Sequence, residues 1–277
     1  MDPTPSRQAK DHVFVDMFNQ PKYCLELFRA IHPEATDITI EDISNITVTH
    51  VVVDKPYNDL GFTVRDKQII LVEAQAKWSM NILFRLLAYL IDSYLRYMKR
   101  KGFDVHDTAI IRLPEPEFYV IYTGENKSVP DEISFRKDFF KNINAKLDLE
   151  AKVIKSENTD DIIGQYIIFC HVYDQQRKLY GADIKAVQET IRICKERGAL
   201  KEYLEAHEEE VLTIMMNIFK QEEAVEMYGN RREKEGKVKA LAELIDDGTL
   251  TLEKAAIKAG MTVQEFQEAV ENLKVTA

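Results

Sequence analysis

The stretch YNDLGFTVRDKQIILVEAQAK, residues 57–77, decides the fold. Two apolar runs flank the polar residues 65–68, which is the pattern of a β-hairpin. If the turn centres on Asp66, residue numbers that sum to 132 face one another, so Asp59 lies opposite Glu73. Directly opposed residues hold their Cβ atoms about 4.5–5.5 Å apart. The sequence therefore predicts two carboxylates at one point of a strand pair.

Two carboxylates this close repel each other, and a hard divalent cation between them is the usual solution. The alternative is that both acids are strand-edge charges that face water. Apolar residues occupy both faces of the strand before Glu73, as in a strand covered on both sides, and an acid at its end needs a partner. Because side chains alternate along a strand, Glu73, Gln75 and Lys77 are expected to share one face.

The composition is that of an ordinary soluble globular protein, with 45% hydrophobic and 30% charged residues among 277. The formal net charge of -10 repels a polyanion, so binding to DNA would need local basic patches and a metal. Three widely spaced cysteines fit a reducing cytosol. No secretory signal is recognised, and charges interrupt the most apolar segment, residues 80–98. We expect a cytoplasmic protein with no membrane partner.

The pattern of elements predicts an α/β (α+β) sandwich in which helices flank a short mixed sheet. Helical periodicity follows Asp11, β-branched residues mark a strand at 46–54, and the hairpin leads into a long amphipathic helix at 80–101. A further strand is expected at 117–124, and an edge strand at 147–155.

Five segments follow from changes in composition. They are a disordered leader at 1–10, a core at 11–158, a helical extension at 159–229, a charged linker or helix at 230–239, and a helical hairpin at 240–277. In the hairpin, Thr262 and Glu265 form a predicted capping box. Its spacing is compatible with a degenerate helix-turn-helix, but its second helix is acidic, so the alternative is a packing or oligomerisation unit.

The hairpin acids suggest the chemistry of a metal-dependent hydrolase. Two acids that share a divalent cation can polarise a phosphodiester and lower the pKa of a bound water. The sequence has no glycine-rich phosphate loop, no GxSxG and no Cys-x-x-Cys, and its six histidines show no ligand spacing.

An Asp at the start of a strand, a turn, then Glu-x-Gln at the end of the next strand and a long helix resemble the PD-(D/E)XK nuclease superfamily. More narrowly, DHVFVDMF at 11–18, the run from 57 to 90, PEFYVIYTGENK at 116–127 and DDIIGQYIIFCHVYDQQ at 160–176 are similar to the Rpn family of recombination-promoting nucleases. The resemblance implies a restriction-endonuclease-like core over 11–158 and a DNA endonuclease, dependent on Mg²⁺ or Mn²⁺, that is linked to transposition and recombination. A homodimer is a further expectation.

The resemblance also implies roles for individual residues. Asp59 and Glu73 match the acids that bind Mg²⁺, with the backbone carbonyl of Ala74 completing the set. Gln75 stands where most members of the superfamily have a catalytic lysine, and an amide can orient water but supplies no positive charge. Lys77 either takes the place of that lysine or is a solvated strand end.

Two further residues have alternative roles. Asp11 is either an additional catalytic acid or a helix N-cap. Arg85 either contacts phosphate or forms a salt bridge. The basic end of the long helix is a candidate DNA-binding patch or a solvated helix end, and it comprises Arg96, Lys99, Arg100 and Lys101. The alternative function is a nuclease fold without turnover that serves as a DNA-binding or protein-interaction module.

Overall fold

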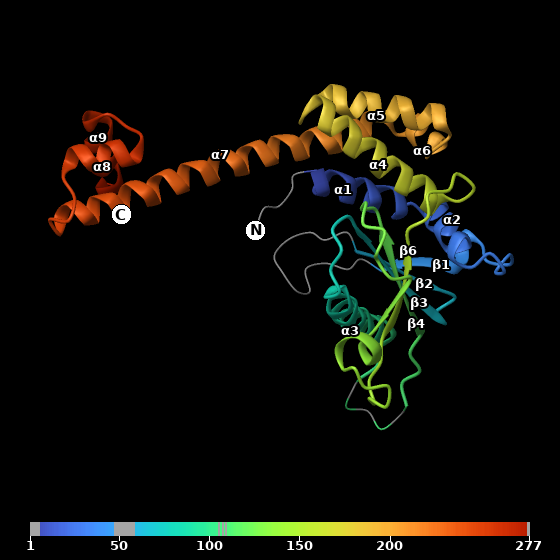
Figure 1. Ribbon diagram of the computed structural model, residues 1–277. Helices are drawn as coiled ribbons and strands as arrows, with labels where there is room; N and C mark the ends of the chain where they lie inside the picture. Colours follow the sequence, from blue (N-terminus) through green and yellow to red (C-terminus); the bar gives the residue numbers. More distant parts are fainter. Residues whose placement is uncertain (1–5, 47–58, 105, 107, 109, 276–277) are drawn as a thin grey trace. The chain divides into compact units, whose positions relative to one another are not determined.

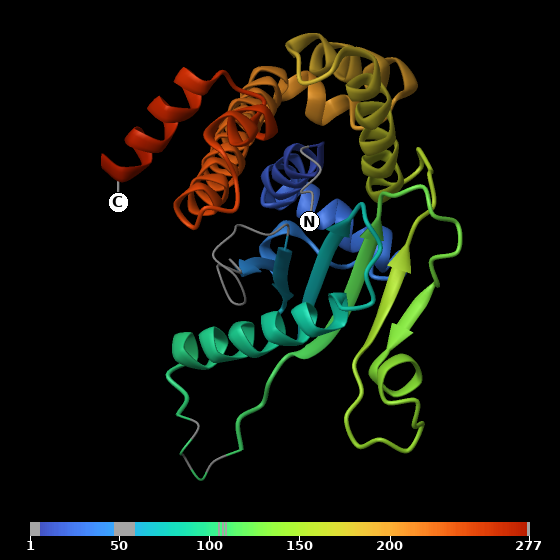
Figure 2. The same cartoon turned by 60° about the vertical axis from the view of Figure 1, so that its left-hand side comes forward.

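The computed structural model describes residues 6–46, 59–104, 106, 108 and 110–275. The chain divides into two compact units, Met1–Ile218 and Phe219–Ala277, and each is described by itself (Figures 1 and 2).

A six-stranded mixed sheet forms the centre of the first unit, with the order β1-β2-β3-β4-β6-β5. Neighbours among β1, β2 and β3 are antiparallel, β4 and β6 run parallel to β3, and β5 is antiparallel to β6. The predicted mixed sheet with flanking helices is confirmed. The strands are β1 (Ile43–Ile46), β2 (Asp59–Val64), β3 (Gln68–Gln75), β4 (Glu115–Tyr122), β5 (Glu132–Ser134) and β6 (Glu150–Ile154).

The β2–β3 hairpin has the register that the sequence predicts, with Asp59 paired to Glu73. Its two central turn residues, Arg65 and Asp66, have φ values of 51° and 54°, as in a type I′ turn that matches the twist of the strands. A left-handed backbone is unfavourable for arginine. The Arg65 side chain offsets that cost, because its Nε donates a hydrogen bond to Asp42 at 2.9 Å.

Helices cover both faces of the sheet. The face that carries Leu71 packs against α3 (Ile82–Lys101), as Figure 2 shows. On the other face, Phe62 of β2 makes an edge contact with Phe28 of α2 (Pro21–Ile31), with ring centroids 6.4 Å apart. The same layer contains α1 (Ser6–Phe18) and α4 (Ile162–Tyr180), which pack against each other through Phe14 and Tyr166. Strand β3 is therefore buried on both faces, as expected.

The amino-terminal part of the chain differs from the prediction. Helix α1 begins at Ser6, so residues 6–10 are helical and not part of a disordered leader. Lys10 is buried and forms a 2.8 Å ion pair with Asp174 of α4, which anchors this end of the helix. Of the strand predicted at 46–54, Ile46 belongs to β1 and residues 47–54 lie outside the described residues.

The strand predicted at 147–155 is present as β6, but its place in the sheet differs from the prediction. It lies between β4 and β5 and is not an edge. The edge on that side of the sheet is β5, a strand of three residues that the sequence did not reveal, and the π-helical turn η2 (Phe135–Phe139) follows it directly.

The helices after the sheet complete the first unit. Helix α4 packs on α1, α2 and β4, so the segment after residue 159 covers the sheet rather than extending away from it. It is followed by α5 (Ile184–Arg197), α6 (Lys201–Ala206) and α7 (Glu208–Asp246). The first unit ends within α7, and the part of this helix from Phe219 onward belongs to the second unit. Residues 230–239 lie within α7, so this segment is helical.

The second unit has a small core of its own. It contains α8 (Leu252–Ala259) and α9 (Val263–Val275), which meet at a turn where Gly260 has a φ of 74°. The predicted capping box is present, because Thr262 N donates to Glu265 at 2.8 Å and Glu265 N donates to Thr262 Oγ1 at 3.2 Å. The core residues are Val238, Leu241, Ala255, Ala256 and Phe266.

Candidate active site at the end of strand β3

Two polar side chains are buried between the sheet and α3, at the carboxyl end of β3. Glu73 and Gln75 alternate with Val72 and Ala74, so they share the face that carries Leu71 and packs against α3. The Glu73 side chain is only 3% exposed, and Gln75 is also buried. Polar groups in such a place require specific partners.

Arg85 supplies the partner of Glu73. Its Nη2 contacts Glu73 Oε1 in a close ion pair, and the Arg85 side chain remains 22% exposed. Arg85 lies in the first turn of α3, so the helix that crosses the sheet after β3 carries the guanidinium back over the strand. Of the two roles considered for Arg85, the structure shows the salt bridge. Its partial exposure leaves part of the Arg85 side chain accessible from solvent.

Asp59 is the first residue of β2, and its Cα is paired with that of Glu73 in the antiparallel ladder. The side chain of Asp59 and residues 47–58 before it lie outside the described part of the chain. The structure thus establishes the backbone register on which the prediction of two opposed acids depends.

Gln75 presents a buried oxygen. Its Oε1 accepts no hydrogen bond from the residues that the structure describes. Buried acceptors in native proteins nearly always have a partner, and ordered water or an ion provides it where protein groups do not. The backbone of Gln75 is fixed, because Thr123 N donates to its carbonyl oxygen at 3.0 Å.

The loops that follow β3 and β4 approach each other closely at Gly124. A Cβ atom at Gly124 would lie 2.2 Å from the carbonyl oxygen of Ala76 and 2.4 Å from Tyr122 Oη. Tyr122 Oη also accepts a 3.1 Å hydrogen bond from Asn126 N. Only glycine allows this approach, which holds the ends of the two strands together beside Gln75.

The structure separates one predicted site residue from this pair and excludes one of the two roles of another. Strand β3 ends at Gln75, so the exposed Lys77 lies beyond it and does not share the strand face with Glu73 and Gln75. Asp11 lies inside α1, which begins at Ser6, so the N-cap interpretation is wrong. Asp11 is near Tyr166 of α4, whose pKa is raised by burial first and then by negative groups that include Asp11.

The predicted DNA-binding patch is at the far end of α3. From residue 85 to residue 100 the helix rises by roughly 22 Å, so the patch is not beside Glu73. Part of its charge is paired with acids. Arg96 Nε lies 2.6 Å from Asp92, while Arg100 and Lys101 lie 3.4 and 2.7 Å from Asp66 in the hairpin turn. Lys99 is also exposed on this turn of the helix.

A pocket of about 500 Å³ follows the carboxyl end of β4, and sequence reasoning did not find it. His171 of α4 lies in it, with Nε2 3.0 Å from the carbonyl oxygen of Thr123 and Nδ1 2.7 Å from Glu157. Its lining comes from segments far apart in the chain, and the one local signal is the loop TGENK directly after a buried strand. The basic residues of the lining are Lys127, Lys155, His171 and Arg197.

Carboxylate and amide oxygens are hard donors of the kind that Mg²⁺ and Mn²⁺ prefer. The Glu73 carboxylate therefore fits one side of such an ion, and the buried oxygen of Gln75 fits a water beside it. Among the side chains that are described, which do not include that of Asp59, no three His, Cys, Asp or Glu groups form a metal site.

Comparisons of the chain with protein-family models, with curated proteins and with solved structures found no match. Within the described residues, no helix has the length and apolar character needed to span a bilayer.

Proposed function

We propose that the chain is a DNA endonuclease, dependent on Mg²⁺ or Mn²⁺, that hydrolyses phosphodiester bonds at the carboxyl end of β3. The observation that carries the proposal is the ladder position of Glu73, buried opposite the backbone of Asp59 and followed on the same face by Gln75. The resemblance to PD-(D/E)XK nucleases of the Rpn family supports the same assignment and suggests a role in transposition or recombination.

In this proposal Asp59, Glu73 and the carbonyl oxygen of Ala74 hold the ion. The ion would polarise the phosphodiester and lower the pKa of a bound water. Gln75 accepts a hydrogen bond from the attacking water through its buried Oε1 and so orients it. Arg85 balances the charge of Glu73, and its partly exposed side chain donates to a phosphate oxygen.

The negative net charge of the chain makes the approach of DNA depend on local cations. The pocket after β4 is lined by Lys127 and Arg197, and it follows the strand that pairs with β3, where Tyr122 is the ladder partner of Gln75. We propose this pocket, together with the basic end of α3, as the route of the DNA backbone.

A plasmid-nicking assay tests the proposal, with Asp59→Asn and Glu73→Gln as the site variants. Glu202→Gln is the matched control, because the Glu202 side chain lies in α6, outside the pocket after β4, and is 73% exposed. Wild type and control should nick supercoiled DNA with Mg²⁺ or Mn²⁺, and both site variants should fall to background. Equal nicking by all four proteins would indicate a contaminating nuclease and refute the assignment.

Two observations favour a second candidate, a nuclease fold that binds DNA or a protein without turnover. Arg85 already engages one oxygen of Glu73, and Gln75 is neutral where a lysine would stabilise the transition state. For this candidate, fluorescence anisotropy should show DNA binding that is weakened by salt, while no divalent ion produces cleavage.

A further inference from the structure

The solvent side of α3 carries an apolar stripe that the core does not use. Phe84, Ile91 and Leu95 are each 53% exposed, and Ala88 lies between them on the same side of the helix. Their spacing of four, three and four residues is that of the contact seam between two paired helices. The opposite side of the same helix faces the sheet and buries Leu86, Tyr89, Ser93 and Tyr97.

The stripe continues from α3 onto η2, which lies beside it (Figure 1). The Phe84 ring makes edge contacts with Phe135 and Phe139, at centroid distances of 5.2 and 5.1 Å. Phe140 stacks on Phe135 at 5.7 Å and is itself 46% exposed. The exposed apolar groups on α3, together with Phe140 next to η2, are here called the α3 seam, made of Phe84, Ala88, Ile91, Leu95 and Phe140.

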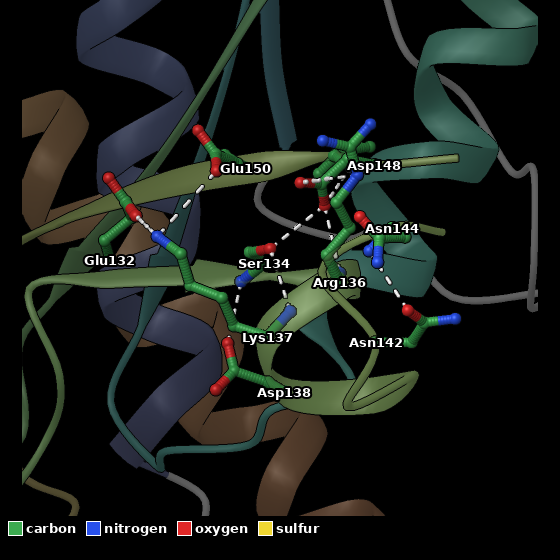
Figure 3. Close-up of polar contacts among 10 residues, drawn as sticks. Glu132, Ser134, Arg136, Lys137, Asp138, Asn142, Asn144, Asp148 and Glu150 are labelled. Atoms are coloured by element: carbon green, nitrogen blue, oxygen red, sulfur yellow. Dashed lines mark hydrogen bonds and ion pairs between the residues drawn. The ribbon is translucent and has the colours of Figure 1, made fainter. Parts of the chain in front are cut away.

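A polar network holds the η2 part of this surface in place (Figure 3). Asp148 accepts hydrogen bonds from Ser134 Oγ at 3.0 Å and from the backbone N–H of Arg136 at 3.1 Å. Asp138 accepts from Ser134 N at 2.8 Å, and Lys137 Nζ lies 2.6 Å from Glu132. These contacts hold the backbone of η2 in one conformation, so Phe135 and Phe139 keep their positions beside Phe84.

The size of the seam is that of an interaction site. Half-exposed side chains at Phe84, Ile91, Leu95 and Phe140 amount to roughly 300–400 Å² of apolar surface, since a complete aromatic side chain has about 150–250 Å² and an aliphatic one less. The largest apolar patch of a typical monomer is about 300–600 Å² and is often functional, so the seam is of that kind. A specific interface buries about 800 Å² on each partner, so the seam could form the apolar centre of one.

We propose that the α3 seam binds a second copy of this chain, with the two α3 helices antiparallel. In that arrangement Phe84 of one copy packs against Leu95 of the other, and Ala88 packs against Ile91, so that large residues meet smaller ones. A twofold axis between residues 88 and 91 relates the two copies, so each of these contacts occurs twice, as a symmetric dimer requires. Asp92 and Arg96, joined in an ion pair, border the seam as part of its polar rim.

Sedimentation equilibrium tests the proposal with Leu95→Glu. Leu179→Glu is the matched control, because Leu179 is 69% exposed near the end of α4 and outside the seam. Wild type and control should be dimers, whereas Leu95→Glu should raise the dissociation constant at least about tenfold, with an unchanged circular dichroism spectrum. A monomeric wild type would refute the proposal, and so would an equal effect of the two substitutions.

Crosslinking tests the antiparallel register. The seam centre lies between residues 88 and 91, so the two copies of residue 88 are about 4.5 Å apart along the axis and the two copies of residue 95 about 16 Å. A bismaleimide that spans about 8 Å should therefore join two copies of Ala88→Cys but not of Leu95→Cys. Equal crosslinking of both variants would contradict the register, and crosslinking of neither would contradict the dimer. The three native thiols are buried and do not compete.

Discussion

Replacing Arg85 with methionine should destabilise the first unit by about 3 kcal/mol, because the substitution leaves the Glu73 carboxylate buried without its guanidinium. The magnitude follows from the exposure of the pair. Breaking a buried ion pair costs roughly 3–5 kcal/mol, and the lower end applies because the Arg85 side chain is 22% exposed while that of Glu73 is 3% exposed.

A double-mutant cycle separates the ion pair from the packing of the two side chains. Glu73→Gln alone should cost about 1–2 kcal/mol, since Arg85 keeps access to water while the buried amide is imperfectly paired. The double variant should cost less than the sum of the single variants, with a coupling energy of at least about 1 kcal/mol. For a unit of this size, a loss of about 3 kcal/mol lowers the midpoint of thermal unfolding by roughly 6–12 °C.

Urea unfolding followed by tryptophan fluorescence is the appropriate assay. The chain has a single tryptophan, Trp78, which packs against Tyr122 with ring centroids 5.9 Å apart. The signal therefore reports on the first unit and not on the second. Strictly additive free energies of unfolding, or a cost below about 1 kcal/mol for Arg85→Met, would refute the ion pair as the partner of the buried acid.

Three further predictions concern the same unit. Gly124→Ala should lower the urea midpoint and cost about 2 kcal/mol or more, since the new Cβ would lie 2.2 Å from the Ala76 carbonyl oxygen; an unchanged midpoint would contradict the close approach. The Arg65 side chain holds the pKa of Asp42 at about 2. The contact between the two side chains therefore stabilises the folded state above the unfolded pKa near 4, and this stabilisation is lost as pH falls toward 2. The difference in free energy of unfolding between wild type and Asp42→Asn should shrink over that range, and a constant difference would contradict it. Burial raises the pKa of each cysteine thiol to about 12. Ellman's reagent at pH 8 should therefore detect no thiol in the native protein and three in denaturant. Rapid labelling of the native protein would contradict the burial of the thiols. These thiols belong to Cys24, Cys170 and Cys194.

The hairpin and the long helix were predictable because their signals are local. The apolar runs on either side of residues 65–68 define the register that pairs Asp59 with Glu73, and the 3.6-residue period defines α3. Strand β5 was missed because three residues carry no measurable period, and their pairing with β6 is a tertiary contact. The start of α1 was missed because the polar residues 6–10 carry no apolar period. Lys10 is anchored by an ion pair with Asp174, which lies 164 positions away in the chain.

The candidate site was predictable to a similar degree. Glu73 and Gln75 follow from strand alternation, and the structure places both on one buried face. The position of Lys77 was not predicted correctly. Strand β3 ends at Gln75, and side chains beyond the end of a strand no longer alternate between its two faces. The pairing of Arg85 with Glu73 depends on how α3 crosses the sheet, which no local pattern specifies.

The most direct test of the proposed metal site is a calorimetric titration of Mn²⁺ into wild type and Glu73→Gln, with tryptophan fluorescence confirming that both are folded. If Glu73 and Asp59 hold the ion, the wild type should bind Mn²⁺ and the variant should bind it at least about tenfold more weakly. Absence of binding to the wild type, or equal binding to both proteins, would contradict a metal-dependent site at the end of β3.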